Sequence, residues 1–373
     1  MTFNEFFNRI ESQYNVELPF VVYRKPNENS INALLQKTDD LIFTQDFTEK
    51  GFVFSPFDNT EKSVLMPLEF SEKFKTAHTV LSDIVTSNNE PKTQNNSEKE
   101  IHINLVKSGV EAIKNNEFKK VVLSRSETVL LSDNYPLSIF KKLLEHYASA
   151  FVYCWYHPKV GLWLGATPET LVKIEGQRFS IMALAGTQNY NGSLDVEWQD
   201  KELQEQQYVT DFILNNIKST IDNIKISAVE TVKAGNLLHL KTKIWGVLRP
   251  NAISLKDLLY SLHPTPAVCG LPKLDAKQFI LKNESYNREF YTGFLGELNL
   301  DVILAPRSGK RNIENRAYAT TKKSTQLYVN LRCMQLKENN AIIYVGGGIT
   351  ESSCPESEWE ETVSKSLVIK KVL

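Results

Sequence analysis

The stretch GGGITESSCPESEWEETVSK, Gly346 to Lys365, joins three glycines to a helix-like segment through a short polar loop. In that segment Glu358, Glu361 and Lys365 are spaced i, i+3 and i+7, so a helix would carry them on one face. The pattern fits either an exposed helix with a glutamate–lysine pair or one half of a metal site. The glycines match neither nucleotide-binding motif, G-x-x-x-x-G-K-[ST] or G-x-G-x-x-G. They follow a strand that we expect to end at Val345, and they predict either a backbone that a ligand approaches closely or a tight turn.

A second segment, QDKELQEQQYVTDFILNNI, repeats the Glu-x-x-Glu spacing at Glu202 and Glu205. If the two helices met, they would gather four carboxylates, whose mutual repulsion would raise their pKa values. Mg²⁺ would relieve this repulsion, because it prefers oxygen ligands and binds through a few carboxylates, waters and substrate oxygens. The sequence thus offers a candidate Mg²⁺ site made of Glu202, Glu205, Glu358 and Glu361.

The composition of the 373-residue chain, 42% hydrophobic and 23% charged, is that of an ordinary globular protein. Lysine and arginine total 43 against 44 for aspartate and glutamate, and the net charge of −1 argues against nucleic acid or an anionic membrane as a partner. The first residues have no signal-peptide pattern and no apolar run approaches the ~18 residues of a membrane span, so we expect a cytoplasmic protein. The cysteines form no C-x-x-C pair, and we expect buried free thiols at Cys154, Cys269, Cys333 and Cys354.

Short runs rich in β-branched and aromatic residues, such as KKVVLSRSETVLL and QLYVNLRCM, predict many strands. Helices are predicted over 136–147, 198–221, 253–262 and 356–367. Strands and helices do not alternate strictly, which disfavours a doubly wound parallel sheet. The sequence therefore predicts an α+β fold, a single large domain with a mostly antiparallel β core flanked by helices.

Two segments differ in composition from the rest. Residues 86–100, TSNNEPKTQNNSEKE, predict a polar linker that ends in a capping box, Ser97-x-x-Glu100, before a helix. We expect residues 1–95 to form the N-terminal part of the same body. Residues Ala305 to Gln326 carry six basic residues and one acid between two strand-like flanks, which predicts a long hairpin loop. A solvated loop is the simplest interpretation, and an arm that steers substrate or binds nucleic acid is the alternative.

Lys120 and Glu169 are candidate proton-transfer groups. Lys120 begins the run KVVLSR, where a buried lysine could have a lowered pKa and act as a base, whereas an exposed lysine is the usual case. Glu169 follows a proline in GATPET at the end of a predicted strand. It is there either a general acid or a turn glutamate.

Other strand-like runs contain candidate binding groups. Gly186 and Thr187 in LAGTQ offer backbone and hydroxyl donors, or form a tight turn. His239 alternates with apolar residues in LLHLKT, which is typical of a core histidine. Arg332 shares a predicted strand face with Asn330 and could bind a carboxylate, with a surface ion pair as the alternative.

Ten motifs occur in order between about residues 98 and 367: KVVLSR, GATPETLV, ALAGT, KELQE, HLKT, HPTPAVCGLPK, NREFYTGFLG, LYVNLRC, GGGI and WEETVSK. Together they resemble the chorismate-utilising enzymes, a family that includes isochorismate, salicylate, anthranilate (component I) and aminodeoxychorismate (component I) synthases. The resemblance implies one large domain with an antiparallel core, Mg²⁺ dependence and chorismate as substrate. It places the chorismate-binding catalytic region at 96–373.

Three positions separate the branches of this family. Members that add water carry a lysine at the position of Lys120, where anthranilate-type enzymes usually have glutamine. Ala185 replaces the nucleophilic lysine of aminodeoxychorismate synthases, and Ala267 stands where salicylate and anthranilate synthases usually have threonine. These residues resemble the isochorismate synthases. A salicylate synthase, which goes on to eliminate pyruvate, is the main alternative. An anthranilate synthase component I and a non-enzymatic protein that binds anions through the basic segment are weaker ones.

The resemblance also implies roles for the candidate residues. Lys120 would activate a water that attacks C2 of chorismate, and Glu169 would protonate the hydroxyl that leaves C4. Glu205 and Glu361 would bind Mg²⁺, with Glu202 and Glu358 close or bound through water. Arg332 and Tyr291 would bind the enolpyruvyl carboxylate. The remaining substrate-binding positions would be Gly186, Thr187, His239, Ala267, Gly346, Gly348 and Lys365.

The resemblance has one departure near the predicted metal site and sets limits on partners. The family often has histidine where this chain has Gln206, next to Glu205. It implies no amidotransferase subunit, and we expect a monomer or weak homodimer. Menaquinone and siderophore biosynthesis are both open as the pathway.

Overall fold

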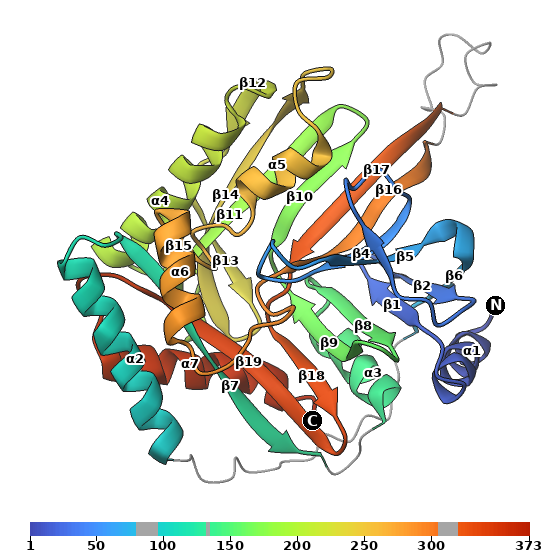
Figure 1. Cartoon of the computed structure of the whole chain (residues 1–373), viewed down its shortest axis with the longest axis horizontal. Helices are drawn as coiled ribbons and strands as arrows, with labels where there is room; N and C mark the ends of the chain where they lie inside the picture. Colours follow the sequence, from blue (N-terminus) through green and yellow to red (C-terminus); the bar gives the residue numbers. More distant parts are fainter. Residues whose placement is uncertain (80–95, 132–134, 305–319) are drawn as a thin grey trace.

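The computed structural model describes residues 1–79, 96–131, 135–304 and 320–373, which form two large antiparallel sheets flanked by helices (Figure 1). The helices of these residues are α1 (Phe3–Asn15), α2 (Asn96–Lys114), α3 (Pro136–His146), α4 (Asp200–Ile217), α5 (Leu255–Leu262), α6 (Lys273–Asn283) and α7 (Pro355–Lys370), with one 3-10 turn, η1 (Leu68–Phe70).

The first sheet has nine strands. Their order is β15 (Gly270–Leu271), β7 (Lys120–Leu130), β19 (Asn340–Ile349), β18 (Cys333–Lys337), β9 (Gly161–Thr167), β8 (Phe151–His157), β1 (Phe20–Arg24), β2 (Ser30–Gln36) and β6 (Ser71–Ala77).

The second sheet has ten strands. Their order is β12 (Ile221–Ile226), β14 (Leu237–Leu248), β11 (Arg178–Asn189), β10 (Thr170–Glu175), β17 (Thr320–Val329), β16 (Phe294–Leu304), β4 (Gly51–Ser55), β5 (Ser63–Pro67) and β3 (Ile42–Thr44), with β13 (Glu230–Ala234) also paired to β14. Every strand pair in the described residues is antiparallel, so the predicted α+β class with an antiparallel core is confirmed.

The sheets meet through a cluster of large buried side chains. Tyr23, Trp155 and Trp163 of the nine-stranded sheet are fully buried together with Phe54 of the ten-stranded sheet. The Phe54 and Trp155 rings lie edge to face with their centroids 5.1 Å apart, a favoured aromatic geometry. Helices α1 and α3 pack on the other side of the nine-stranded sheet, and α4 and α5 pack on the ten-stranded sheet.

The N-terminal residues contribute strands to both sheets. Strand β1 pairs with β8 in one sheet, and β4 pairs with β16 in the other. The predicted linker over 86–100 is too long at its end, because α2 begins at Asn96 and its first turn includes Ser97 and Glu100. The helix therefore begins before Ser97, the residue predicted as its N-cap. The rest of the linker, 86–95, lies outside the described residues.

The predicted helices are all present, with shifted ends. Helix α4 ends at Ile217, not at 221, because Ile221 is already paired with Leu248 in the ten-stranded sheet. Helices α1 and α6 were not predicted. Among the described residues no helix is long and apolar enough to span a membrane. Cys354 is exposed at the N-cap of α7, contrary to the expectation of a buried thiol, whereas the other three cysteines are buried.

The hairpin predicted around the basic segment is confirmed, since β16 and β17 pair. Residues 305–319 of that segment lie outside the described residues, and Thr320–Gln326 belong to β17. The strand predicted to carry both Asn330 and Arg332 is wrong. Strand β17 ends at Val329, and Arg332 has a φ of 49°, which interrupts the extended backbone.

Two of the points at which the chain passes from one sheet to the other lie next to each other. At Pro168–Glu169 it leaves β9 of the nine-stranded sheet for β10 of the ten-stranded sheet, and at Asn330–Arg332 it returns from β17 to β18. We call these the two sheet crossings. The Val329 N–H donates to Glu169 O at 3.1 Å, and the Thr167 hydroxyl donates to Val329 O at 2.6 Å. These bonds fix the crossings side by side, so Glu169 and Arg332 come from neighbouring backbone.

Candidate active site

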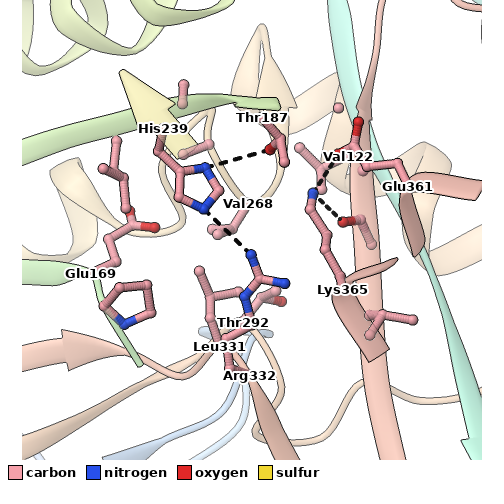
Figure 2. Close-up of a pocket in the computed structure, with 18 of the residues that line it drawn as sticks. Val122, Glu169, Thr187, His239, Val268, Thr292, Leu331, Arg332, Glu361 and Lys365 are labelled. Atoms are coloured by element: carbon pink, nitrogen blue, oxygen red, sulfur yellow. Dashed lines mark hydrogen bonds and ion pairs between the residues drawn. The ribbon is translucent and has the colours of Figure 1, made fainter. Parts of the chain in front are cut away.

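A cavity opens between the two sheets beside the sheet crossings (Figure 2). It holds about 700 Å³ not filled by protein atoms, a figure that includes space open to solvent. Both sheets, both crossings, α4 and α7 contribute to its walls. In Figure 2, Glu169 and Lys365 lie on opposite sides, with His239 and Arg332 between them.

Glu169 brings a buried carboxyl group to one wall. Its side chain is only 3% exposed, and burial raises its pKa to about 8, with the nearby Lys120 charge opposing that shift. Because the pKa lies above neutrality, the carboxyl group is mostly protonated at pH 7. Such a group can donate a proton to a leaving group, which an ordinary surface glutamate cannot do at this pH.

Arg332 presents its guanidinium group to the same cavity. It is half-buried, and burial lowers the pKa of Arg332 despite its nearness to Tyr291 and Glu361. No carboxylate of the described residues forms an ion pair with it, and its hydrogen bond to His239 Nε2 is long, at 3.4 Å. A half-buried cation with free donors facing a cavity is suited to bind an anionic ligand.

His239 orients the guanidinium group from the ten-stranded sheet. Its Nδ1–H donates to Gly186 O at 2.8 Å, so Nε2 is the acceptor that faces Arg332. Burial, followed by the charge of Arg332, lowers the pKa of His239 to about 3. The ring is therefore neutral and does not compete with Arg332 for an anion. It is more than the core histidine that its strand pattern indicated.

Gly186 and Thr187 form a bulge in β11 where the register with β14 shifts between Ala185 and Gln188. Gly186 has a φ of +70°, a conformation that glycine adopts at little cost. A Cβ at this position would lie 3.1 Å from Cβ of Glu202. The bulge therefore turns Gly186 and Thr187 toward the cavity and allows α4 to approach.

The three glycines lie within β19, not after a strand that ends at Val345. The structure explains them by close approach. A Cβ on Gly348 would lie 2.5 Å from Glu205 Oε1, and a Cβ on Gly347 would lie 3.3 Å from Glu358 Oε2. Carboxylates from two helices thus reach β19 at Gly346–Gly348 from both of its faces, which side chains at these positions would prevent. We call this part of β19 the glycine strand.

Side chains of α4 and α7 do come together at this strand. Three of the four glutamates each form an ion pair with a lysine. Lys120 Nζ lies 2.8 Å from Glu205 Oε1, Lys201 Nζ lies 2.6 Å from Glu358 Oε1, and Lys365 Nζ lies 2.5 Å from Glu361 Oε1. Lys201 was missed from the sequence, where it is one more polar residue at the start of a helix.

The pKa values within this cluster differ with the local charges. Burial alone would raise the pKa of Glu205, but the adjacent Lys120 ammonium outweighs it and the net shift is downward. Burial and the neighbouring Glu361 raise the pKa of Glu358, against the opposing effect of Lys201. The carboxylates therefore repel one another, as expected for a group that gathers to hold a cation.

The fit of this cluster to Mg²⁺ rests on its free oxygens. In the described ranges no three or more His, Cys, Asp or Glu side chains are placed so that they alone could enclose a metal. Two buried carboxylate oxygens, Glu202 Oε2 and Glu358 Oε2, have no hydrogen-bond partner in those ranges. Mg²⁺ commonly binds through one or two carboxylates, with waters and substrate oxygens completing its shell. The residues present fit such an ion.

Most of the predicted site residues line the cavity. These are Glu169, Gly186, Thr187, Glu205, His239, Ala267, Tyr291, Arg332, Gly346, Gly348, Glu361 and Lys365. Lys120, Glu202 and Glu358 do not line the cavity themselves. Each lies against a lining residue or the glycine strand. Apolar lining residues such as Leu184, Val268 and Leu331 were missed, because their sequence patterns match those of core positions.

Gln206 does not face the carboxylates. Its side chain is buried, and Nε2 donates to Ala183 O at 3.2 Å and to the Thr242 hydroxyl at 2.9 Å. These hydrogen bonds fix α4 to β11 and β14 and do not involve Glu205.

Comparison with known proteins gives the class of this chain. Residues 53–309 and 317–371 match models of the chorismate binding enzyme family. Isochorismate synthase MenF of Pasteurella multocida is 30% identical over 293 residues, which cover 72% of this chain and 60% of that enzyme. Anthranilate synthase component 1 of Lactococcus lactis is 27% identical over 288 residues, which cover 74% of this chain and 58% of that protein. The matched region thus spans about three fifths of these curated relatives.

A solved structure extends the likeness to the whole fold. The menaquinone-specific isochorismate synthase MenF of Escherichia coli superposes with a TM-score of 0.74 at 19% identity, over 95% of this chain and 88% of that one. The chain belongs to the chorismate binding enzyme family, and the resemblance carried by the ten ordered motifs is confirmed.

Proposed function

We propose that this protein is an isochorismate synthase, an isomerase that converts chorismate to isochorismate with Mg²⁺. One observation carries the proposal: a buried glutamate with a pKa near 8, Glu169, lies in one cavity with Arg332, a guanidinium group that has no acidic partner among the described residues. A protonated acid beside an anion-binding cation suits the loss of a hydroxyl group from a carboxylated ring.

In the proposed reaction, a water attacks C2 of the ring as the C4 hydroxyl departs and the double bonds shift. Glu169 donates its proton to the C4 oxygen, so that water and not hydroxide leaves. A base removes one proton from the attacking water, and the balance is one water in and one water out. General acid–base catalysis of this kind contributes about 10²–10⁴-fold to a rate.

Lys120 is the proposed base, on the strength of its fully buried position and its resemblance to the lysine of water-adding members. Its ammonium group is paired with Glu205 at 2.8 Å and lies behind that residue, outside the lining of the cavity. The base must be a neutral amine, so this role requires Glu205 to be neutralised by another cation.

The proposed Mg²⁺ ligands are Glu205 and Glu361, with Glu202 and Glu358 close or bound through water. The free, buried oxygens of Glu202 and Glu358 and the repulsion between Glu358 and Glu361 support this assignment. When bound, the ion supplies charge that holds the ring carboxylate and polarises the substrate. Lys365, which donates to Gly346 O at 2.9 Å, holds Glu361 and the glycine strand together.

The second carboxylate of chorismate, on the enolpyruvyl group, is proposed to bind Arg332 and Tyr291. Tyr291 is 3% exposed and stacks on Tyr344 with ring centroids 5.4 Å apart, so its position is fixed. Burial raises the pKa of Tyr291, which keeps the phenol protonated as a donor. Gly186, Thr187, His239, Ala267, Gly346 and Gly348 would complete the substrate pocket.

Two small residues favour the isochorismate synthase branch. Ala185 and Ala267 both line the cavity. A nucleophilic lysine at 185 would be required for attack by an amine on the ring, and alanine cannot supply it. No amidotransferase subunit is proposed, because the nucleophile is water.

Incubation with chorismate and Mg²⁺ tests the proposal. The product is identified by NMR, and pyruvate is followed with a coupled enzyme. Isochorismate without pyruvate is the expected result. Salicylate with pyruvate would assign the protein to the salicylate synthases. No turnover with any divalent cation would refute the enzymatic proposal.

A further inference from the structure

Behind the cavity wall lies Arg288, a buried arginine that the proposed reaction does not use. It is 3% exposed, and it pairs with the equally buried Glu284 through two bonds, Nε to Oε2 at 2.7 Å and Nη2 to Oε1 at 2.6 Å. A bidentate pair of this kind fixes the plane of the guanidinium group.

The remaining donors of Arg288 bind three parts of the cavity wall. Nη2 donates to Val122 O at 2.7 Å, and Nη1 donates to Val268 O at 3.0 Å and to the Thr292 hydroxyl at 3.2 Å. With the two bonds to Glu284, all five guanidinium N–H groups are used. Val122, Val268 and Thr292 all line the cavity and are labelled in Figure 2.

The three acceptors come from separate segments. Val122 is on β7, Val268 follows Ala267 in the loop before β15, and Thr292 follows Tyr291 before β16. One side chain thus fixes the relative position of the wall that carries Ala267 and Tyr291. Glu284 extends this link, since it accepts bonds from Ser124 N and Oγ, both at 2.8 Å.

A second buried arginine, Arg125, contacts the other half of the site. It lies on β7 and is 8% exposed. Its guanidinium carbon is 4.4 Å from the centroid of the Trp359 ring, and its Nε donates to the Thr362 hydroxyl at 2.9 Å. Each of these two residues directly follows one of the carboxylates of α7, Glu358 and Glu361.

The contacts of Arg125 therefore tie α7, which packs on β19, to the neighbouring strand β7. Trp359 is 2% exposed and Thr362 is fully buried, and the Thr362 hydroxyl also donates to Trp359 O at 2.8 Å. Rotation or sliding of α7 would break the stacking and the hydrogen bond together. The same movement would displace Glu358 and Glu361 from the glycine strand.

We infer that Arg288 and Arg125 are positioning residues with separate tasks: Arg288 holds the substrate wall and Arg125 holds the metal-binding helix. The inference rests on the proposed function. Neither arginine touches the cavity, so each acts through the residues it binds. A loss of general stability would affect both halves of the site alike, whereas separate tasks predict opposite patterns in two constants.

The test compares Arg288→Lys and Arg125→Lys, which keep the charge and lose the fork of donors. The first constant is the KM for chorismate at saturating Mg²⁺, and the second is the Kd for Mg²⁺ alone, measured by calorimetry. Arg288→Lys is expected to raise the KM for chorismate about tenfold with little change in the Kd for Mg²⁺. Arg125→Lys is expected to raise the Kd for Mg²⁺ about tenfold with little change in the KM. Changes of this size are typical when a residue that supports a binding site is removed.

Arg24→Lys is the matched control. Arg24 is also buried and donates to Leu144 O and Tyr147 O, at 2.8 and 2.7 Å, but neither acceptor lines the cavity. This variant is expected to lose stability and to change neither constant. Equal shifts of both constants in the two test variants, or no shift in either, would overturn the inference.

Single-contact variants cover the case in which an arginine variant does not fold. Thr362→Val removes the acceptor for Arg125, and Thr362→Ser keeps it, so only the valine variant is expected to weaken Mg²⁺ binding. Glu284→Gln weakens the fork on Arg288 and is expected to raise the KM alone. If the wild-type protein binds Mg²⁺ but does not turn over chorismate, the proposed function and the Arg288 assignment fail. The Mg²⁺ titration then decides the Arg125 assignment by itself.

Discussion

The carboxylate helices and the two sheet crossings build opposite sides of the same cavity by different means. Helices α4 and α7 place their glutamates by a regular spacing, with Glu205 and Glu361 each three residues from a second carboxylate. The crossings place Glu169 and Arg332 where regular structure stops and the chain changes sheet. The helix side carries four carboxylates with their lysines, whereas the crossing side carries one buried acid and one arginine without an acidic partner among the described residues, so mutations should affect the two sides differently.

The largest effect is expected on the crossing side, from Glu169→Gln. The amide has the size of the carboxyl group but cannot donate the proton, so kcat should fall about 10²–10⁴-fold. The melting temperature should not fall, because the variant removes a buried ionisable group. Near-wild-type kcat in the folded variant would show that Glu169 is not the acid.

Lys120→Ala should lose activity to a similar degree, and it also tests the link between the two sides. It leaves Glu205 without its ion-pair partner, so the affinity for Mg²⁺ should rise while kcat falls. Lys241→Ala, which removes an exposed partner of Glu230, is the control and should change neither quantity. If Lys120→Ala retains kcat, another group is the base.

On the helix side, Glu361→Gln should act mainly through the metal. Removing one of two proposed ligands should raise the Mg²⁺ concentration for half-maximal activity by about 100-fold, while kcat at saturating Mg²⁺ falls much less. Titration of activity with Mg²⁺ measures both. A variant with an unchanged Mg²⁺ requirement would remove Glu361 from the site.

Arg332→Lys should give a smaller change on the crossing side. Lysine keeps the charge but not the planar pair of donors, so the KM for chorismate should rise about tenfold. The kcat should change less, because the proposed partner of Arg332, the enolpyruvyl carboxylate, does not itself react. Steady-state kinetics at saturating Mg²⁺ separates the two constants. A large loss in kcat with an unchanged KM would contradict the binding role.

The smallest effect is a pH dependence of stability that belongs to the crossing side alone. The pKa of Glu169 is about 8 in the folded protein, against an ordinary value of 4.5. A raised pKa means that the folded state binds the proton more tightly, so this contribution to stability is complete below pH 4.5 and is lost as the pH rises through about 8. Melting temperatures of wild type should therefore fall faster than those of Glu169→Gln between about pH 6 and pH 9. Parallel curves would contradict the raised pKa.

The difference between the two sides also sets how much could be predicted from sequence. The Glu-x-x-Glu spacing in two helix-like segments identified α4 and α7 and their carboxylates, because helical periodicity is a local property. The antiparallel core followed from the many β-branched runs. The branch-specific positions, Lys120, Ala185 and Ala267, came only from resemblance to a family.

The crossing side could not be predicted in the same way. The run containing Asn330 and Arg332 has the composition of a single strand, yet buried hydrogen bonds hold Asn330 in the crossing and the strand ends at Val329. The Tyr153 hydroxyl donates to Asn330 Oδ1 at 2.6 Å, and Asn330 Nδ2 donates to Phe290 O at 2.9 Å. These bonds come from residues 40 and 177 positions away, so no local pattern contains them. Arg288 and Lys201 were missed for the same reason.

The glycine strand connects the two sides. Its glycines were predicted to lie near a ligand; they line the cavity, and the structure also places Gly347 and Gly348 against carboxylates of two helices. A tripeptide that looks like a loop lies here within a strand, near its C-terminal end, and the absence of side chains is what allows α4 and α7 to share one site.

Turnover of chorismate in H₂¹⁸O with Mg²⁺ tests the central claim most directly. If water attacks C2 while the C4 hydroxyl leaves, NMR and mass spectrometry should find isochorismate with one ¹⁸O at C2, and no pyruvate. Isochorismate without the label, or salicylate with pyruvate, would contradict the account.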